Sequence, residues 1–332
     1  MYLFRHKIGG ITFLTESDIE LTTIQNDGFQ RFTIRETRQD VYHQVHKVEE
    51  KDLTLAALSS KDQERVSRCI IPPQLGRGSF ILPPFVRNRG EDAGFIPCPP
   101  VQNPFDFPLF RSPVVRERLE ACLDYPEQVG LLLHIFSVII FDYRLHRIDL
   151  FYRSDQRWVF ENIPLDNGLR RMFTSFLPSF SALMLHSSGV VRKGCAALFL
   201  APDAGGKSTV METLDGGVIL CDDQNILRKH GEIFMVHSTP WGAIHSGPQH
   251  ACLGGFFLLE KAPAYGLTPV KYTDIFQFLW DEHMHFWLKL PSSLRIKAFE
   301  LLYDACRQTP CYRMRFPKDY VDWDAIDAAM AR

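Results

Sequence analysis

The stretch that most constrains this chain is 201–209, which reads APDAGGKST. It follows an apolar run at 196–200 that predicts a short buried strand. It precedes 210–214, which predicts a helix ending at Gly216-Gly217. A glycine loop with Lys-Ser between a strand and a helix is typical of a phosphate-binding loop. The fold must therefore bring a strand end, this loop and a helix start together.

The loop carries residue types that suit a nucleotide. Glycines let backbone N–H groups converge on phosphate oxygens, and a helix start adds the positive end of its dipole. Lys207 can then reach the β- and γ-phosphates, and the Ser208 hydroxyl can bind Mg²⁺. Ala201 stands where the pattern has its first glycine, so the loop is expected to begin with ordinary backbone angles. The residues expected to bind the nucleotide are Asp203, Ala204, Gly205, Gly206, Lys207, Ser208 and Thr209.

An acidic pair follows the next apolar run. Residues 218–221 predict a second buried strand, and Asp222 and Asp223 come directly after it. A carboxylate at a strand end beside a phosphate loop is where phosphotransferases hold Mg²⁺. A second carboxylate can take the proton from an attacking hydroxyl. Which aspartate has which role stays open.

Three segments together carry a family resemblance. LHSSGVV at 185–191, CAALFLAPDAGGKST at 195–209 and GGVILCDD at 216–223 resemble the catalytic core of HPr kinase/phosphorylase and its relatives. Those relatives share the nucleotide-binding fold of phosphoenolpyruvate carboxykinase. The resemblance extends over 183–261 and is weak over 1–150. It implies a kinase that phosphorylates a hydroxyl, with Asp222, Asp223, His186 and Lys207 as catalytic residues.

The resemblance also implies ATP and Mg²⁺, with the metal held by Ser208, Asp222 and Asp223. The acceptor would be a serine of a protein or peptide, or a small hydroxyl compound. HPr itself is not expected, because the longer C-terminal signature of HPr kinases is absent. A carboxykinase is not expected either, since those chains are much longer. Two alternatives stay open: an ATP-binding sensor or scaffold without turnover, and an enzyme that also removes phosphate by phosphorolysis.

Three further residues are weaker candidates. In the relatives, the region of His237 and Trp241 borders the acceptor site, although simple packing explains both residues equally well. Lys261 follows the predicted strand at 255–260 and could reach a phosphate, or it could be an ordinary surface lysine. The histidines between 237 and 250 have no spacing that indicates a metal site.

Composition indicates which classes of partner and which cellular compartment to expect. The chain has 37 Lys and Arg against 39 Asp and Glu in 332 residues, which argues against a nucleic-acid or anionic-membrane surface. Its 8 cysteines lack CxxC pairing, so they are expected to be reduced, in the cytoplasm. No signal peptide is expected at the start, and the apolar stretch 129–141 is too short to span a bilayer. A homo-oligomer is possible.

The expected fold class is α/β. It combines a mixed-sheet P-loop kinase core of the HPr kinase and carboxykinase type with a β-rich N-terminal lobe. Residues 1–113 form the lobe, which includes a Pro/Phe-rich loop at 72–113, and 114–332 form the core. Proline removes backbone donors, so 72–113 cannot lie inside a sheet or helix. It is either a surface loop or a lid that binds the acceptor.

Overall fold

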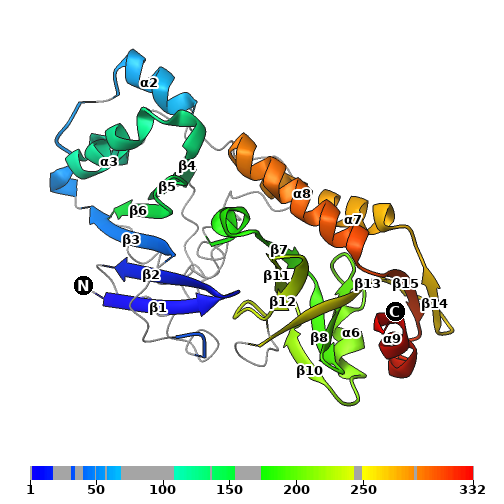
Figure 1. The fold of residues 1–332 in the computed structure, drawn as a ribbon. Coiled ribbons are helices and arrows are strands. Elements are labelled where there is room, and N and C mark those ends of the chain that lie inside the picture. The colour runs from blue at the N-terminus through cyan, green and yellow to red at the C-terminus, as the bar shows by residue number, and fades with distance from the viewer. Residues whose placement is uncertain are drawn as a thin grey trace. The chain divides into compact units, whose positions relative to one another are not determined.

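The computed structural model describes residues 2–17, 31–33, 40–48, 50–56, 58–68, 108–134, 137–153, 173–242, 249–287 and 290–331 (Figure 1). Contacts divide the chain into two compact units. The first contains Met1–Arg5, Phe13–Ile24 and Arg38–Met172, and the second contains His6–Thr12, Gln25–Thr37 and Phe173–Arg332. Most of the Pro/Phe-rich loop, 72–107, lies outside the described residues.

The first sheet has six strands in the order β1-β2-β3-β6-β5-β4. β3 pairs in parallel with β2 and β6, whereas β5 pairs antiparallel with β4 and β6. The strands are β1 (Tyr2–Ile8), β2 (Ile11–Ser17), β3 (Val41–Val48), β4 (Val129–His134), β5 (Ser137–Asp142) and β6 (Arg147–Arg153). The helices of this unit are α2 (Ser60–Ser67) and α3 (Pro113–Leu123), with a 3₁₀ turn at Pro108–Arg111 before α3. Apolar residues of both helices and of β4–β6 form one buried cluster.

A buried carboxylate ties 114–153 to the N-terminal strands. Asp149 on β6 accepts hydrogen bonds from Arg118 on α3 and from Arg147, and it contacts His46 on β3 at 3.1 Å. Burial alone would raise the pKa of Asp149, but these partners hold it well below its ordinary value. Beyond residue 38, the division by contacts falls at 172/173, whereas the sequence predicted a boundary at 113/114.

The second sheet has nine strands and is mixed. Its main order is β10-β8-β9-β13-β12-β11-β7, with β15 beside β13 and β14 beside β15. β13 pairs in parallel with β9 and β15, and antiparallel with β12. The strands are β7 (Ala182–His186), β8 (Ser188–Arg192), β9 (Cys195–Leu200), β10 (Val218–Cys221), β11 (Gln224–His230), β12 (Ile233–His237), β13 (His250–Lys261), β14 (Gly266–Pro269) and β15 (Cys311–Phe316).

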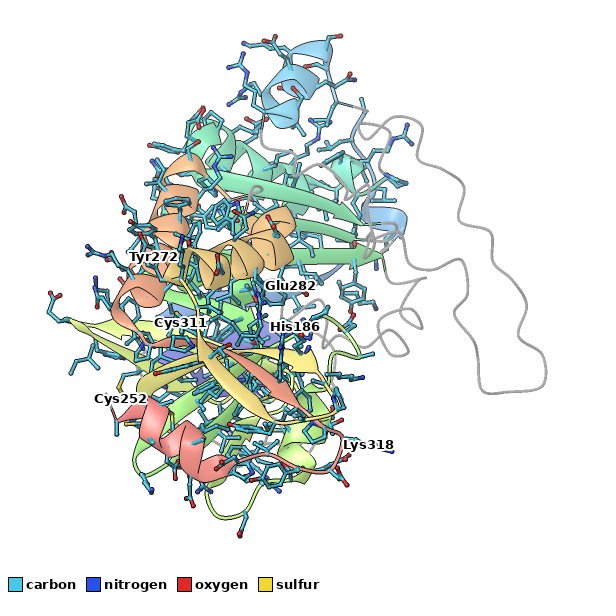
Figure 2. The ribbon with its side chains drawn as sticks, turned by 90° about the vertical axis from the view of Figure 1, so that its right-hand side faces the viewer. His186, Cys252, Tyr272, Glu282, Cys311 and Lys318 are labelled. Atoms are coloured by element: carbon cyan, nitrogen blue, oxygen red, sulfur yellow. The ribbon has the colours of Figure 1, made fainter. Side chains whose placement is uncertain are left out.

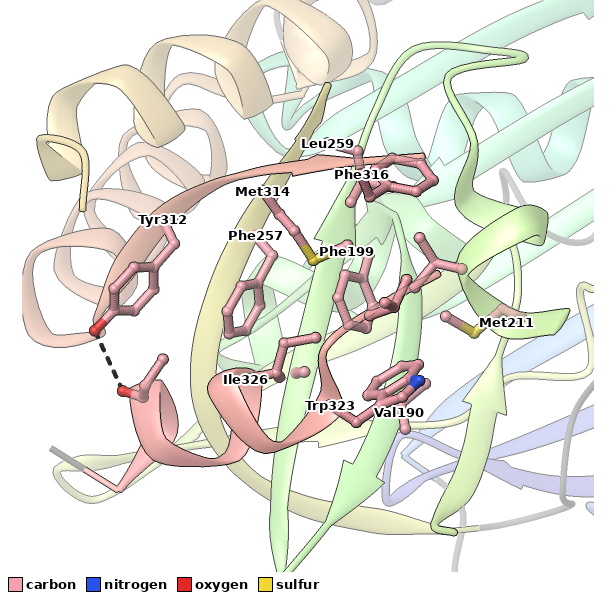
Figure 3. Close-up of a cluster of buried hydrophobic side chains, with 14 of the residues drawn as sticks. Val190, Phe199, Met211, Phe257, Leu259, Tyr312, Met314, Phe316, Trp323 and Ile326 are labelled. Carbon is pink, nitrogen blue, oxygen red and sulfur yellow. Dashed lines mark hydrogen bonds between the residues drawn. The ribbon is translucent and has the colours of Figure 1, made fainter. Parts of the chain in front are cut away.

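Four helices accompany this sheet. They are α6 (Lys207–Glu212), α7 (Tyr272–Trp287), α8 (Ser292–Gln308) and α9 (Trp323–Met330). α7 packs on α8, and both contact β7. α6 and α9 contribute to a buried cluster in which Phe199 lies between Phe257 and Trp323, at ring distances of 5.4 and 5.8 Å (Figure 3). The Tyr312 hydroxyl donates a hydrogen bond to the Ala329 carbonyl, which fixes the end of α9 on β15.

The architecture is thus α/β with mixed sheets, which confirms the expected fold class. The strand before the glycine loop and the strand before the acidic pair are both present. The helix after the loop is shorter than expected and ends at Glu212. No helix in the described part of the chain is long and apolar enough to cross a membrane.

Candidate functional site

The loop between β9 and α6 needs glycine at two positions. A side chain at Gly205 would lie 2.5 Å from the Ala201 Cβ and 2.8 Å from the Pro202 carbonyl oxygen. Gly206 has a φ of +104°, and a side chain there would lie 2.6 Å from Phe316. Packing of the loop on itself and on β15 therefore excludes larger residues at both positions.

The unusual backbone conformation falls on Ala204 and not on Ala201. Ala204 has a φ of +59°, and it is one of four non-glycine residues with positive φ in the described ranges. Ala201 has no positive φ, in agreement with the expectation that the loop begins with ordinary angles. A left-handed alanine costs about 1–3 kcal/mol, and such strain is common where a loop is shaped for a ligand.

Two lysine ammonium groups donate hydrogen bonds to carbonyls of the loop. Lys207 is buried, and its Nζ donates hydrogen bonds to the Ala201 and Pro202 carbonyls at 2.8 and 3.4 Å. Lys261, at the end of β13, donates from Nζ to the Ala204 carbonyl at 2.8 Å. Burial lowers the pKa of Lys207, although three nearby carboxylates oppose this shift. The structure thus places both lysines at the loop.

His186 connects the loop to the acidic pair. It ends β7, where it pairs with Gln224, the residue after Asp223. Its Nε2 lies 3.0 Å from Asp223 Oδ1 and 3.6 Å from Asp203 Oδ1, and its Nδ1 lies 3.0 Å from Glu282 Oε1. The hydrogen bond with Asp223 raises the pKa of His186, burial opposes this shift, and Glu282 adds to it. Figure 2 labels His186 and Glu282 next to each other.

Helix α7 fixes His186 through a second residue. The backbone N–H of His186 donates to Nε2 of His283 at 3.1 Å. Burial lowers the pKa of His283 to about 3, so its imidazole is neutral and its Nε2 lone pair can accept this bond. The sequence of 272–290 predicts a helix, but nothing in that pattern indicates that Glu282 and His283 contact His186, so sequence reasoning missed both.

The two aspartates are held by backbone contacts and face different neighbours. The Ser188 hydroxyl donates to the Asp222 carbonyl at 2.6 Å, and the Ser187 N–H donates to the Asp223 carbonyl at 2.9 Å. The Asp222 carboxylate lies close to Gly242, whereas the Asp223 carboxylate contacts His186. The structure thus brings Asp223, and not the Asp222 carboxylate, to the histidine.

The remaining sequence candidates have other surroundings. Ser208 is exposed at the start of α6, and Thr209 is half-buried beside it. His237 ends β12 and stacks on His250 at 5.2 Å. Trp241 is buried, with its ring edge-on to Phe173. Both His237 and Trp241 thus pack against aromatic rings.

The donor set near the loop suits Mg²⁺ delivered with a nucleotide. In the described ranges, no group of three or more His, Cys, Asp or Glu side chains is arranged to hold a metal ion. Mg²⁺ is usually held by one or two carboxylates together with substrate phosphates, so no ready-made cage is needed. Hydroxyl and carboxylate oxygens, as on Ser208 and Asp222, are ligands of that kind.

The chain was also compared with known proteins. No protein family matches it, and no curated protein does. Among solved structures, the HPr(Ser) kinase/phosphatase from Coxiella burnetii matches with a TM-score of 0.22 and 10% sequence identity, over 44% of this chain and 91% of that one. A similarity with so low a TM-score shows neither the fold nor the function of this chain.

Proposed function

We propose that this protein is a kinase that transfers the γ-phosphoryl group of MgATP to a hydroxyl group. One observation carries the proposal. The Nε2 atom of His186 lies 3.6 Å from Asp203 in the glycine loop and 3.0 Å from Asp223 at the end of β10. A phosphate-binding loop and a carboxylate able to accept a proton thus share one histidine.

The loop supplies the phosphate contacts of this proposal. α6 has only six residues, so the binding energy would come from loop N–H groups and from Lys207 rather than from the helix dipole. Lys207 now donates to two loop carbonyls and has three donors in all. A phosphate would be a better partner for this buried ammonium, because it carries a negative charge and the loop carbonyls do not. Lys261 would add positive charge on the outer side of the loop.

Asp223 is the proposed general base. The acceptor hydroxyl would lose its proton to Asp223 as its oxygen bonds to the γ-phosphorus. The bond from that phosphorus to the β,γ-bridging oxygen would break, and ADP would leave. His186 is a positioning residue in this scheme: it holds the Asp223 carboxylate, and Glu282 holds the other side of the imidazole. A protonated His186 would favour the ionised form of Asp223 in the resting site.

Ser208 and Asp222 are the proposed protein ligands of Mg²⁺. Asp222 is assigned here because the Asp223 carboxylate is already held by His186. When bound, Mg²⁺ neutralises charge on the β- and γ-phosphate oxygens. The acceptor is proposed to be a serine of a protein or peptide, or a small hydroxyl compound.

The test is phosphoryl transfer by the purified full chain. MgATP is incubated with serine-containing peptides and small alcohols, and ³¹P NMR follows ADP and the new phosphate ester. We expect transfer to one class of acceptor, its loss in Lys207→Ala, and its retention in Lys318→Ala, which removes an exposed lysine outside the site. Circular dichroism checks that both variants fold. Full activity in Lys207→Ala would refute the site, and tight ATP binding without turnover would favour a sensor.

A further inference from the structure

A second feature of the sheet lies outside the kinase site. Strand register places three sulfur-containing residues side by side: Met235 on β12 pairs with Cys252 on β13, and Cys252 pairs with Cys195 on β9. Paired residues on neighbouring strands put their side chains on the same face of a sheet. Cys252 therefore has a sulfur-containing neighbour on each side.

Met235, Cys252 and Cys195 form a row across three strands, and two of these residues are in close contact. Cys252 Sγ lies 3.5 Å from Met235 Sδ. The register of β13 shifts at Gly254. Because glycine has no side chain, the sulfur of Met330 can approach the strand there. The Met330 Sδ atom at the end of α9 and the Cys195 Cβ atom both lie 2.9 Å from the position that a Gly254 side chain would take. Two thiols and two thioethers thus gather around the start of β13.

The row can be reached from solvent. Cys252 is exposed, and Cys195, Met235 and Met330 are partly exposed. Figure 2 labels Cys252 and, for comparison, Cys311. The other cysteines in the described part of the chain are buried. Burial raises the pKa of those thiols, so they are poor sources of a thiolate.

The donor atoms of these four side chains favour one kind of metal ion over others. Thiolate and thioether sulfurs are soft donors, and Cu(I) is a metal ion that prefers them. Zn²⁺ instead takes thiolate, imidazole or carboxylate, and two of the four donors here are thioethers. Two sulfurs bound at about 2.3 Å to one tetrahedral ion lie about 3.8 Å apart. The 3.5 Å between Cys252 and Met235 is close to that separation.

We propose that Cys195, Cys252, Met235 and Met330 form a binding site for one Cu(I) ion, independent of the kinase site. Cys252 is the central ligand because it has a sulfur-containing neighbour on both adjacent strands. Binding requires no change in the backbone of β9, β12 or β13, since register already places the donors together. Rotation of the side chains would turn the thiol and thioether groups toward one ion.

The test is a titration of the full chain with Cu(I) under anaerobic, reducing conditions. Bathocuproine disulfonate competes for the metal and reports it by absorbance, and native mass spectrometry counts the ions bound. We expect one Cu(I) per chain, with X-ray absorption showing sulfur ligands alone. Cys252→Ser should weaken binding by at least about tenfold, and Met235→Leu, which conserves volume, should weaken it measurably.

Matched controls separate this site from other thiols. Cys311→Ser removes a buried cysteine outside the row and should leave Cu(I) affinity unchanged. Phosphoryl transfer by Cys252→Ser should equal that of the wild type, because Cys252 has no part in the kinase site. The proposal is overturned if the wild type takes no Cu(I) from the chelator, or if Cys252→Ser and Cys195→Ser bind as tightly as the wild type.

Discussion

Nδ1 of His186 lies 3.0 Å from Oε1 of Glu282, a residue 96 positions further along the chain. The opposite nitrogen of the same ring contacts Asp223. A ring with a carboxylate on each side holds its proton more strongly than a free imidazole does, so the pKa of His186 is raised. Glu282 therefore influences the proposed base through the histidine and not by direct contact.

Replacing Glu282 by Gln tests this arrangement. The amide cannot stabilise the imidazolium as a carboxylate does, so the pKa of His186 should fall towards its ordinary value. The Cε1–H resonance of His186, followed by NMR across a pH titration, measures the change. Phosphoryl transfer should weaken, with the larger effect on kcat than on KM for ATP.

Glu300→Gln is the control, because Glu300 is exposed on the neighbouring helix α8. It should leave the titration of His186 and the rate of transfer unchanged. An unchanged pKa of His186 in Glu282→Gln would show that the 3.0 Å contact does not influence the histidine in solution.

The two aspartates should give different signatures when each is changed to Asn. Both variants should lose transfer activity by about 100-fold or more, since general base catalysis and metal binding are each worth that much. Only Asp223→Asn should also lower the pKa of His186, because the hydrogen bond with Asp223 is the main cause of its shift. Asp222→Asn should instead raise the Mg²⁺ concentration needed for half-maximal activity. If both variants shift His186 equally, the division of roles is wrong.

Local patterns in the sequence were sufficient for part of this site. The glycine loop, Lys207 and the acidic pair each lie in a contiguous stretch whose flanking strands are apolar, so residue order alone placed them at strand ends. The roles of these residues stay predictions. The periodicity of 292–308 and of 311–316, each with a proline near one end, also predicts a helix and a strand, and the structure has both with these bounds.

Contacts across long separations could not be predicted in this way. Glu282 and His283 reach His186 because α7 packs against β7, and nothing in either segment specifies that partner. The row of Cys195, Cys252 and Met235 likewise depends on the register of three strands. Residues 114–153 group with the N-terminal strands because β6 pairs with β3, a parallel pairing between distant segments.

Acid should destabilise the protein through two partly buried histidines. Burial lowers the pKa of His283 and of His237 to about 3, from an ordinary value of 6.5. Between these values the unfolded chain binds more protons than the folded one, so stability is present above about pH 6.5 and falls as the pH drops. Each group contributes at most about 1.4 kcal/mol per pH unit. His186 has a raised pKa, so its contribution is complete below pH 6.5 and adds no slope there.

His283→Gln tests this dependence, because glutamine keeps a carbonyl acceptor for the His186 N–H but does not titrate. Urea unfolding at pH 7.0, 6.0 and 5.0 should show a smaller loss of stability in the variant than in the wild type. His237→Gln should reduce the slope independently, and the double variant should reduce it further. If the free energy of unfolding depends on pH in all three variants as it does in the wild type, other groups control acid stability.

Asn225 joins the two segments that present His186 and Asp223, so its removal should affect both stability and activity. Its buried Nδ2 donates to the Ser187 carbonyl at 2.6 Å and to the Cys221 carbonyl at 3.1 Å. Asn225→Ala leaves these acceptors without that donor, at a cost of about 1–3 kcal/mol in the free energy of unfolding.

Urea unfolding measures this loss, and the dependence on urea concentration should stay the same, since the variant exposes a similar surface on unfolding. Transfer should fall even where the variant is fully folded, because His186 and Asp223 lose their common support. Gln277→Ala is the control, since that side chain binds Asp281 on the exposed surface of α7. Its stability should stay within about 0.5 kcal/mol of the wild type. Wild-type activity in folded Asn225→Ala would show that the backbone of these segments holds the site without the amide.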